Sequence, residues 1–98
     1  MHIITRRALI EFGKRYPAAV TPLAVWYRTM KSKRYHDAHE VKADFPQTDF
    51  LGHSLTVFDI NGNKFQLVVN MRYRRGKAYI RHVLTHAEYE KLSKAGRL

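Results

Sequence analysis

Residues 61–89, with the sequence NGNKFQLVVNMRYRRGKAYIRHVLTHAEY, constrain the fold of this chain more than any other segment. Asn61-Gly62 is the dipeptide most typical of a tight turn between two antiparallel strands. Apolar and polar residues alternate on both sides of a second, basic turn at residues 74–77, as they do in strands with one buried face. The segment therefore predicts a long β-hairpin within an antiparallel sheet.

The alternation assigns the side chains to two faces, given a two-residue turn at Asn61-Gly62 and a four-residue turn at residues 74–77. One face is apolar and is predicted to be the core, with Phe58, Phe65, Leu67, Val69, Met71, Ala78, Ile80 and Leu84. The other face is mainly polar, with Asp59, Lys64, Gln66, Asn70, Arg72, Tyr79 and Arg81. A shift of one residue would exchange the two faces, but the first set is too apolar to face water. In this register His82 falls on the core face.

The first half of the chain has the apolar spacing of helices. Leu9, Phe12 and Tyr16 recur at helical intervals after Thr5, the expected N-cap, and Pro17 ends this first helix. A hydroxyl cap followed by proline, at residues 21–22, predicts the start of a second helix. Within it, Trp26 is expected to pack between the helices and the sheet, because large aromatic side chains dominate small cores.

Two further helices are predicted from their caps. Asp37 and Glu40 have the spacing of a capping box for a short helix that ends before Pro46. Thr85 and Glu88 form a second such box, which opens a short C-terminal helix. We therefore expect a single α+β domain over residues 1–98, with N-terminal helices packed on a twisted antiparallel sheet and a short C-terminal helix.

The chain is strongly basic, with a formal net charge of +10, and the excess is concentrated in its last third. Residues 1–63 contain nine Lys/Arg and six Asp/Glu, whereas residues 64–98 contain nine and two. Positive charge gathered on one face indicates a polyanionic partner. A basic solvated surface or an interface for an acidic protein would explain the charge equally well.

Composition also limits the possible chemistry and location. The chain has no cysteine, which excludes disulfides, thiolate catalysis and cysteine-type zinc sites. His36 and His39 lack the order of the HExxH motif and a third ligand, so no metal site and no cofactor are predicted. The longest apolar run, residues 23–27, is far shorter than the roughly 20 residues of a membrane helix. We expect a cytoplasmic protein.

The polar face and the C-terminal helix carry groups suited to cleaving RNA through its own 2′-hydroxyl. Such a site removes a proton from the 2′-oxygen, neutralises charge on the phosphorane and protonates the leaving oxygen. Imidazole transfers protons near neutral pH, and guanidinium groups match phosphate oxygens. Arg81, Lys64, His86 and Tyr89 can converge at one end of the basic face, with Gln66 and Asn70 as neutral donors.

Four segments, in this order and spacing, resemble one known family. They are LAVWYR at residues 23–28, VKADFP at 41–46, FDINGNKFQLVV at 58–69 and YIRHVLTHAEYEK at 79–91. The chain resembles the HigB-type toxins of bacterial type II toxin–antitoxin systems, within the RelE/ParE-like group. The resemblance implies a small α/β domain and an mRNA interferase that acts on messages in the ribosomal A site. It also implies a HigA-like helix-turn-helix antitoxin, which represses the operon together with the toxin.

The resemblance implies a catalytic set made of Arg81, His86, Tyr89 and Lys64. At Gln66 the chain departs from relatives that commonly have arginine, which places the phosphate contact at that position in question. The remaining residues expected to hold messenger or ribosomal RNA are Asn70, Arg72, Arg74, Arg75, Lys77, Tyr79, Lys31, Lys33 and Arg34.

Two other functions fit the same sequence. A toxin of similar fold could bind and inhibit DNA gyrase without cleaving RNA, and it would need no acid–base residues. A non-catalytic RNA-binding module would need the basic face alone.

Overall fold

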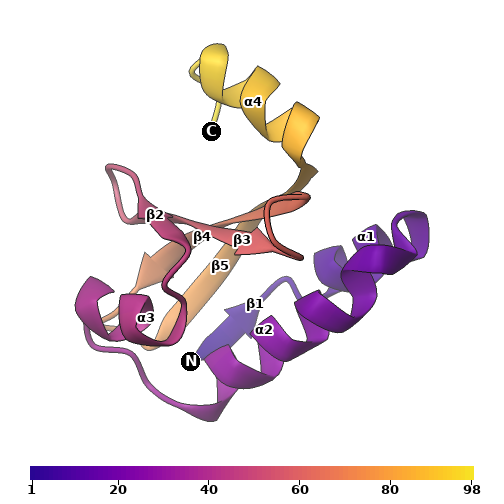
Figure 1. Cartoon of the computed structure of the whole chain (residues 1–98). Coiled ribbons are helices and arrows are strands. Elements are labelled where there is room, and N and C mark those ends of the chain that lie inside the picture. Colours follow the sequence, from indigo (N-terminus) through magenta and orange to yellow (C-terminus); the bar gives the residue numbers. More distant parts are fainter.

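A mixed five-stranded sheet in the order β1-β5-β4-β3-β2 forms the centre of the computed structural model, which describes residues 1–98 (Figure 1). The strands are β1 (His2–Ile4), β2 (Thr48–Phe50), β3 (Leu55–Ile60), β4 (Phe65–Arg72) and β5 (Lys77–Thr85). Neighbouring strands are antiparallel except for the edge strand β1, which pairs parallel with β5. The predicted α+β class is confirmed, and the parallel β1 makes the sheet mixed.

Helices cover both faces of the sheet. The helices are α1 (Arg7–Arg15), α2 (Val20–Ser32), α3 (Ala38–Asp44) and α4 (His86–Lys94), with a 3₁₀ turn η1 (Pro17–Ala19) between α1 and α2. In Figure 1, α1 and α2 lie on one side of the sheet and α4 lies on the other. None of these helices has the length and apolar character needed to span a bilayer.

Two predicted helix starts are wrong. Thr5 does not cap α1, because its backbone has a φ of 81° and the helix begins only after Arg6. The second helix begins at Val20 rather than at Thr21-Pro22, because the 3₁₀ turn runs directly into it. The predicted capping box of α4 is confirmed: the Thr85 hydroxyl accepts from the amide of Glu88, whose carboxylate accepts from the amide of Thr85.

Both hairpins form where the sequence predicts them, although their loops differ in length or position. Ile60 pairs with Phe65, so the loop at Asn61-Gly62 contains four residues instead of two. Arg72 pairs with Lys77, so the basic loop lies one residue earlier than expected. In each hairpin the observed partner of a residue lies two positions away from the predicted partner. Because side chains alternate with a period of two, every side chain of β3 and β4 stays on its predicted face.

A β-bulge at Arg81 alters the second half of β5. Val69 pairs with Ile80 and Val68 pairs with His82, so Arg81 has no partner on β4. One extra residue exchanges the faces beyond it. The prediction that His82 faces the helix-covered core is therefore wrong, and Leu84, opposite Gln66, also leaves that face. Val83 packs against the core instead.

The main core lies between the sheet and helices α1, α2 and α3. Trp26 is 2% exposed and packs edge-on against Phe58, with ring centroids 5.4 Å apart. Phe45 contacts the same Phe58 ring from the end of α3, at 5.1 Å. The predicted anchoring role of Trp26 is confirmed. These contacts hold the helices on one face and leave the other face of β4 and β5 to α4 and the solvent.

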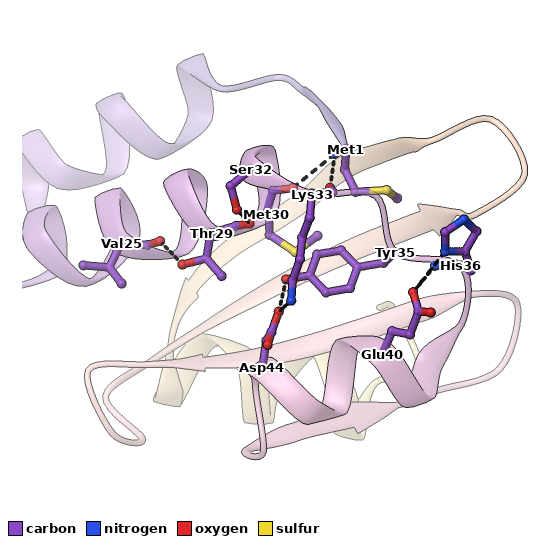
Figure 2. Close-up of polar contacts among 10 residues, drawn as sticks. All are labelled: Met1, Val25, Thr29, Met30, Ser32, Lys33, Tyr35, His36, Glu40 and Asp44. Carbon is purple, nitrogen blue, oxygen red and sulfur yellow. Dashed lines mark hydrogen bonds and ion pairs between the residues drawn. The ribbon is translucent and has the colours of Figure 1, made fainter.

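Polar contacts tie α3 to the segment after α2 (Figure 2). The Tyr35 hydroxyl donates to Asp44 at 2.6 Å, and the Lys33 ammonium lies 2.5 Å from the same carboxylate oxygen. Hydrogen bonds from Lys33 and then Tyr35 lower the pKa of the Asp44 carboxyl below its ordinary value. Burial raises the pKa of the Tyr35 hydroxyl, and Asp44 raises it further, so this hydroxyl remains a donor.

We expect Asp44→Asn to destabilise the fold in a pH-dependent manner. The pKa of Asp44 is lower in the folded chain than the ordinary 3.8, so the ionised carboxylate stabilises the fold above that pH. This stabilisation is lost as the pH falls through the folded pKa. The Tm difference between wild type and Asp44→Asn should therefore narrow below about pH 4. Glu11→Gln, which breaks the exposed pair with Arg7, should leave Tm nearly unchanged. A Tm difference between wild type and Asp44→Asn that stayed constant as the pH falls would contradict a stabilising role of the ionised carboxylate.

Candidate active site

A hollow of about 570 Å³ lies on the face of the sheet opposite α1 and α2 and is lined by positively charged side chains. Its lining residues are Asn70, Arg72, Arg75, Tyr79, Ile80 and Arg81. Five of these six, all except Ile80, were predicted from the alternation of the hairpin and the resemblance. Three guanidinium groups around one hollow, with an amide and a phenol, form a surface suited to phosphate oxygens.

Three separate local features bring these arginines together. Arg72 is the last residue of β4, and Arg75 lies in the loop that follows it. Arg81 is the bulged residue of β5, and its side chain is exposed. A bulge releases a residue from the regular ladder and redirects its side chain. The bulge therefore presents Arg81 to solvent beside the two arginines from the other end of the hairpin.

A second polar cluster lies at the opposite end of β4 and is centred on Gln66. This side chain is only 1% exposed. Its amide nitrogen donates to Asn63 Oδ1 at 2.9 Å and lies 3.3 Å from Asp59 Oδ1, the residue opposite it on β3. Its amide oxygen faces the Nδ1 atom of His86 at 3.4 Å. Gln66 is thus fully engaged within the protein.

His86 is held on three sides. Its backbone amide donates to the carbonyl of Lys64 at 3.0 Å, which attaches the start of α4 to the β3–β4 loop. Its Nδ1 atom faces Gln66, and its Nε2 atom lies 3.1 Å from a carboxylate oxygen of Glu90, one turn along α4. Both ring nitrogens therefore face oxygen acceptors. The ring remains 41% exposed, so a substrate can reach it.

Tyr89 and Lys64 lie near this cluster but differ in environment. Tyr89 is half-buried, and burial raises the pKa of its hydroxyl, with Asp49 and Asp59 raising it further. The phenol therefore stays protonated and can act as a donor. Lys64 lies in the β3–β4 loop with an exposed side chain.

The predicted catalytic residues thus divide between two places on one face. Arg81 lies in the hollow, beside the Val68–Val69 step of β4, whereas Lys64 and His86 lie beyond the other end of that strand. Val68 lies four positions along the chain from Lys64, which is about 13 Å along a strand. The arginine and the imidazole are therefore neighbours along the sheet rather than contacts. A polynucleotide lying along β4 and β5 would meet both.

Of the other predicted RNA contacts, two are engaged within the protein. Arg34 donates to the carbonyl oxygens of Tyr73 and Arg74 at 3.1 and 2.7 Å, so it braces the loop that carries Arg75. Lys33 is paired with Asp44. The remaining members are Lys31, Arg74 and Lys77; the first two are exposed and Lys77 is half-buried. Lys31 lies on α2, away from the hollow, with its ammonium 5.5 Å from the ring centroid of Tyr27.

Sequence reasoning missed Asn63, Glu90 and the true position of His82. Burial lowers the pKa of His82, and the charge of Arg81 lowers it further, so the ring is neutral at pH 7. Its Nε2 atom is buried without a partner, as is Oδ1 of Asn70, which lines the hollow. The sequence did offer one signal: the regular alternation of apolar and polar residues placed the polar His82 in the core, which indicates that the alternation breaks near Arg81. Asn63 carried no signal of its own, whereas Glu90 stands four residues after His86 on the predicted C-terminal helix, a spacing at which side chains pair.

Comparison with known proteins identifies the family of this chain. Residues 19–92 match the model of the HigB toxins, described as the RelE-like toxic component of a toxin–antitoxin system. The chain belongs to the HigB toxin family. It is 33% identical over 92 residues to the mRNA interferase toxin HigB of Escherichia coli strain K12, covering 92% of this chain and 88% of that protein.

Similar relatives agree with this assignment. The mRNA interferase HigB of Shigella flexneri shows the same 33% identity over 92 residues. The mRNA interferase HigB of Escherichia coli O6:H1 is 27% identical over 96 residues, which cover 96% of this chain and 93% of that protein. Membership in a family of toxic components implies an antitoxin partner.

Proposed function

We propose that this toxin is an endoribonuclease that cleaves messenger RNA on the ribosome. The observation that carries the proposal is the arrangement of one sheet face, which holds an arginine-lined hollow and, about 13 Å further along β4, a held but accessible imidazole. Relatives named mRNA interferases, matched over nearly their whole length, support the same activity. The toxin would act in the cytoplasm, where a HigA-like antitoxin would neutralise it and bind operator DNA in the complex.

The groups on this face suggest how the reaction would proceed. Arg81 would extend its long, exposed side chain along the sheet toward His86, so that both groups reach one scissile phosphate. Its guanidinium would neutralise charge as the 2′-oxygen attacks phosphorus. His86 would transfer a proton to or from the reacting oxygens, because imidazole is suited to this near neutral pH. Tyr89 would donate a hydrogen bond or stack on a base, and Lys64 would add charge. Attack by the 2′-hydroxyl breaks the bond to the 5′-oxygen and leaves a 2′,3′-cyclic phosphate.

The other basic residues would anchor the messenger or the ribosome. Arg72, Arg75 and Tyr79 share the hollow with Arg81, and exposed Arg74 lies in the same loop as Arg75. Each phosphate contact adds affinity that salt weakens. Arg34 would act indirectly, by bracing this loop through its bonds to two backbone carbonyls.

A reconstituted translation reaction tests the proposal. The purified toxin is added to a labelled message, either naked or on stalled ribosomes with an empty A site. We expect fragments ending in 2′,3′-cyclic phosphate, mainly from ribosome-bound message. Cleavage of naked RNA at the full rate would remove the ribosome requirement alone. Intact messages in every reaction would exclude the nuclease and favour a non-catalytic RNA-binding or gyrase-binding protein.

Gln66 provides a separate prediction about His86. Gln66→Leu should lower kcat for message cleavage by about tenfold with little change in KM, because one hydrogen bond that orients the imidazole is lost. Nitrogen-15 NMR of the histidine ring should show a changed Nδ1 signal, and the melting temperature would report any structural loss. A raised KM with unchanged kcat would instead identify Gln66 as an RNA contact.

A further inference from the structure

An apolar groove lies between α1 and α2, on the face of the molecule away from the arginine-lined hollow. The two helices approach closely at Gly13, where an added Cβ atom would lie 2.9 Å from Val20 Cγ2. Their outer surfaces enclose about 450 Å³, with Ile10, Val20, Ala24 and Tyr27 among the apolar lining residues. Ile10 and Val20 are 52% and 51% exposed. Such a concave apolar surface is typical of a binding site.

Cations border this groove. Arg6, Lys14 and Arg28 line it together with the apolar residues. The Arg6 guanidinium lies 4.4 Å from the centroid of the Tyr27 ring, so its charge is held at the edge of the groove. Glu11 is the one acidic residue among residues 1–36, and it does not line the groove but pairs with Arg7 on the exposed side of α1. An occupant with apolar side chains flanked by carboxylates would complement both features.

The apolar lining of the groove and its cationic border together favour one kind of occupant. A second copy of this chain carries a charge of +10, and both copies would bring cationic rims together. RNA would satisfy the rim but would leave Ile10 and Val20 against a polar backbone. A helix with apolar residues on one side and carboxylates beside them satisfies both the floor and the rim. The family supplies a partner protein, the antitoxin.

We propose that the α1–α2 groove binds an acidic amphipathic segment of the antitoxin. The apolar side chains of that segment would cover Ile10, Val20 and Tyr27, and its carboxylates would meet Arg6, Lys14 and Arg28. Because α1 and α2 lie on the other side of the sheet from Arg81, this contact anchors the antitoxin without occupying the hollow. Binding through the groove is therefore separable from cleavage of RNA.

Two substitutions test the groove by different means. Ile10→Glu introduces a negative charge among the apolar lining residues, and Ala24→Trp fills the space with an apolar ring. Both positions are exposed, so both variants are expected to fold, and circular dichroism checks this. Val25→Glu is the matched control, because Val25 is 47% exposed on α2 but does not line the groove.

The measurement is titration calorimetry of each folded toxin with the purified antitoxin encoded by the neighbouring gene. We expect Ile10→Glu and Ala24→Trp to raise Kd at least tenfold, and Val25→Glu to leave it within about twofold. Both groove variants should still arrest growth, and co-expressed antitoxin should rescue that growth poorly. Wild-type affinity for both variants, or equal weakening by Val25→Glu, would overturn the proposal. A wild-type toxin dimer that both groove variants dissociate would overturn it in favour of self-association.

Discussion

Arg81→Ala should lower the rate of ribosome-dependent message cleavage by about 10²–10³-fold, the loss typical when a group that stabilises transition-state charge is removed. Arg81 is unpaired in the strand ladder and lines the hollow beside Arg72 and Arg75. Its exposed side chain contributes little to the core, so the free energy of unfolding should stay near that of wild type. The measurement is single-turnover cleavage of a labelled message on stalled ribosomes.

Two controls separate the role of this guanidinium from net charge. Arg97→Ala removes one positive charge from an exposed position near the C-terminus and should leave cleavage almost unchanged. Arg81→Lys keeps the charge but loses the fork of donors that matches phosphate, so it should recover only part of the rate. Equal losses in Arg81→Ala and Arg97→Ala would indicate a general effect of charge on RNA binding.

His86→Ala should reduce cleavage by about 10²–10⁴-fold, the range of a general acid or base. Both ring nitrogens face acceptors, Gln66 and Glu90, so the ring is held in one orientation while its edge remains accessible. The substitution keeps the helix start, because the Thr85 and Glu88 capping box is unaffected. The observed quantity is the cleavage rate under saturating message, so that loss of binding does not contribute.

His36→Ala is the matched control for His86→Ala. His36 is also paired with a glutamate four residues ahead, Glu40, but it precedes α3 and does not line the hollow. Its loss should leave cleavage within about twofold of wild type. If His86→Ala cleaved as fast as His36→Ala, another group would have to transfer the proton. If His86→Ala and Arg81→Ala both remained toxic without cleavage, gyrase inhibition would explain the toxicity better.

The features that could be predicted from the sequence depend on neighbouring residues. The turn at Asn61-Gly62, the capping box at Thr85 and the alternation along β4 are local patterns, and each appears in the structure. In β4 the alternation appears as core membership of every second residue, Phe65, Leu67, Val69 and Met71. Trp26 was predictable because few other environments suit so large an apolar side chain. Arg72 followed from the same alternation, whereas Arg75 lies in the loop after β4 and Arg81 is presented by the bulge.

The features that escaped prediction depend on tertiary contacts. The segment from Tyr79 to His82 fits regular alternation, and only its pairing with Val68 and Val69 reveals the bulge. The parallel pairing of β1 joins residues at opposite ends of the chain. Gln66 looked solvent-facing because its position is on the polar face. It is buried there, with its amide engaged by Asn63 on one side and His86 on the other.

Message 5′ ends can be mapped in cells after brief induction of wild-type toxin and of Arg81→Ala, to show whether the toxin cleaves translated messages through Arg81. We expect new 5′ ends within translated regions for the wild type. These ends should be lost when initiation is blocked, and they should be absent for Arg81→Ala at equal protein level. Growth arrest by the wild type with messages intact would contradict the nuclease proposal. The same new 5′ ends from Arg81→Ala would contradict the role proposed for Arg81.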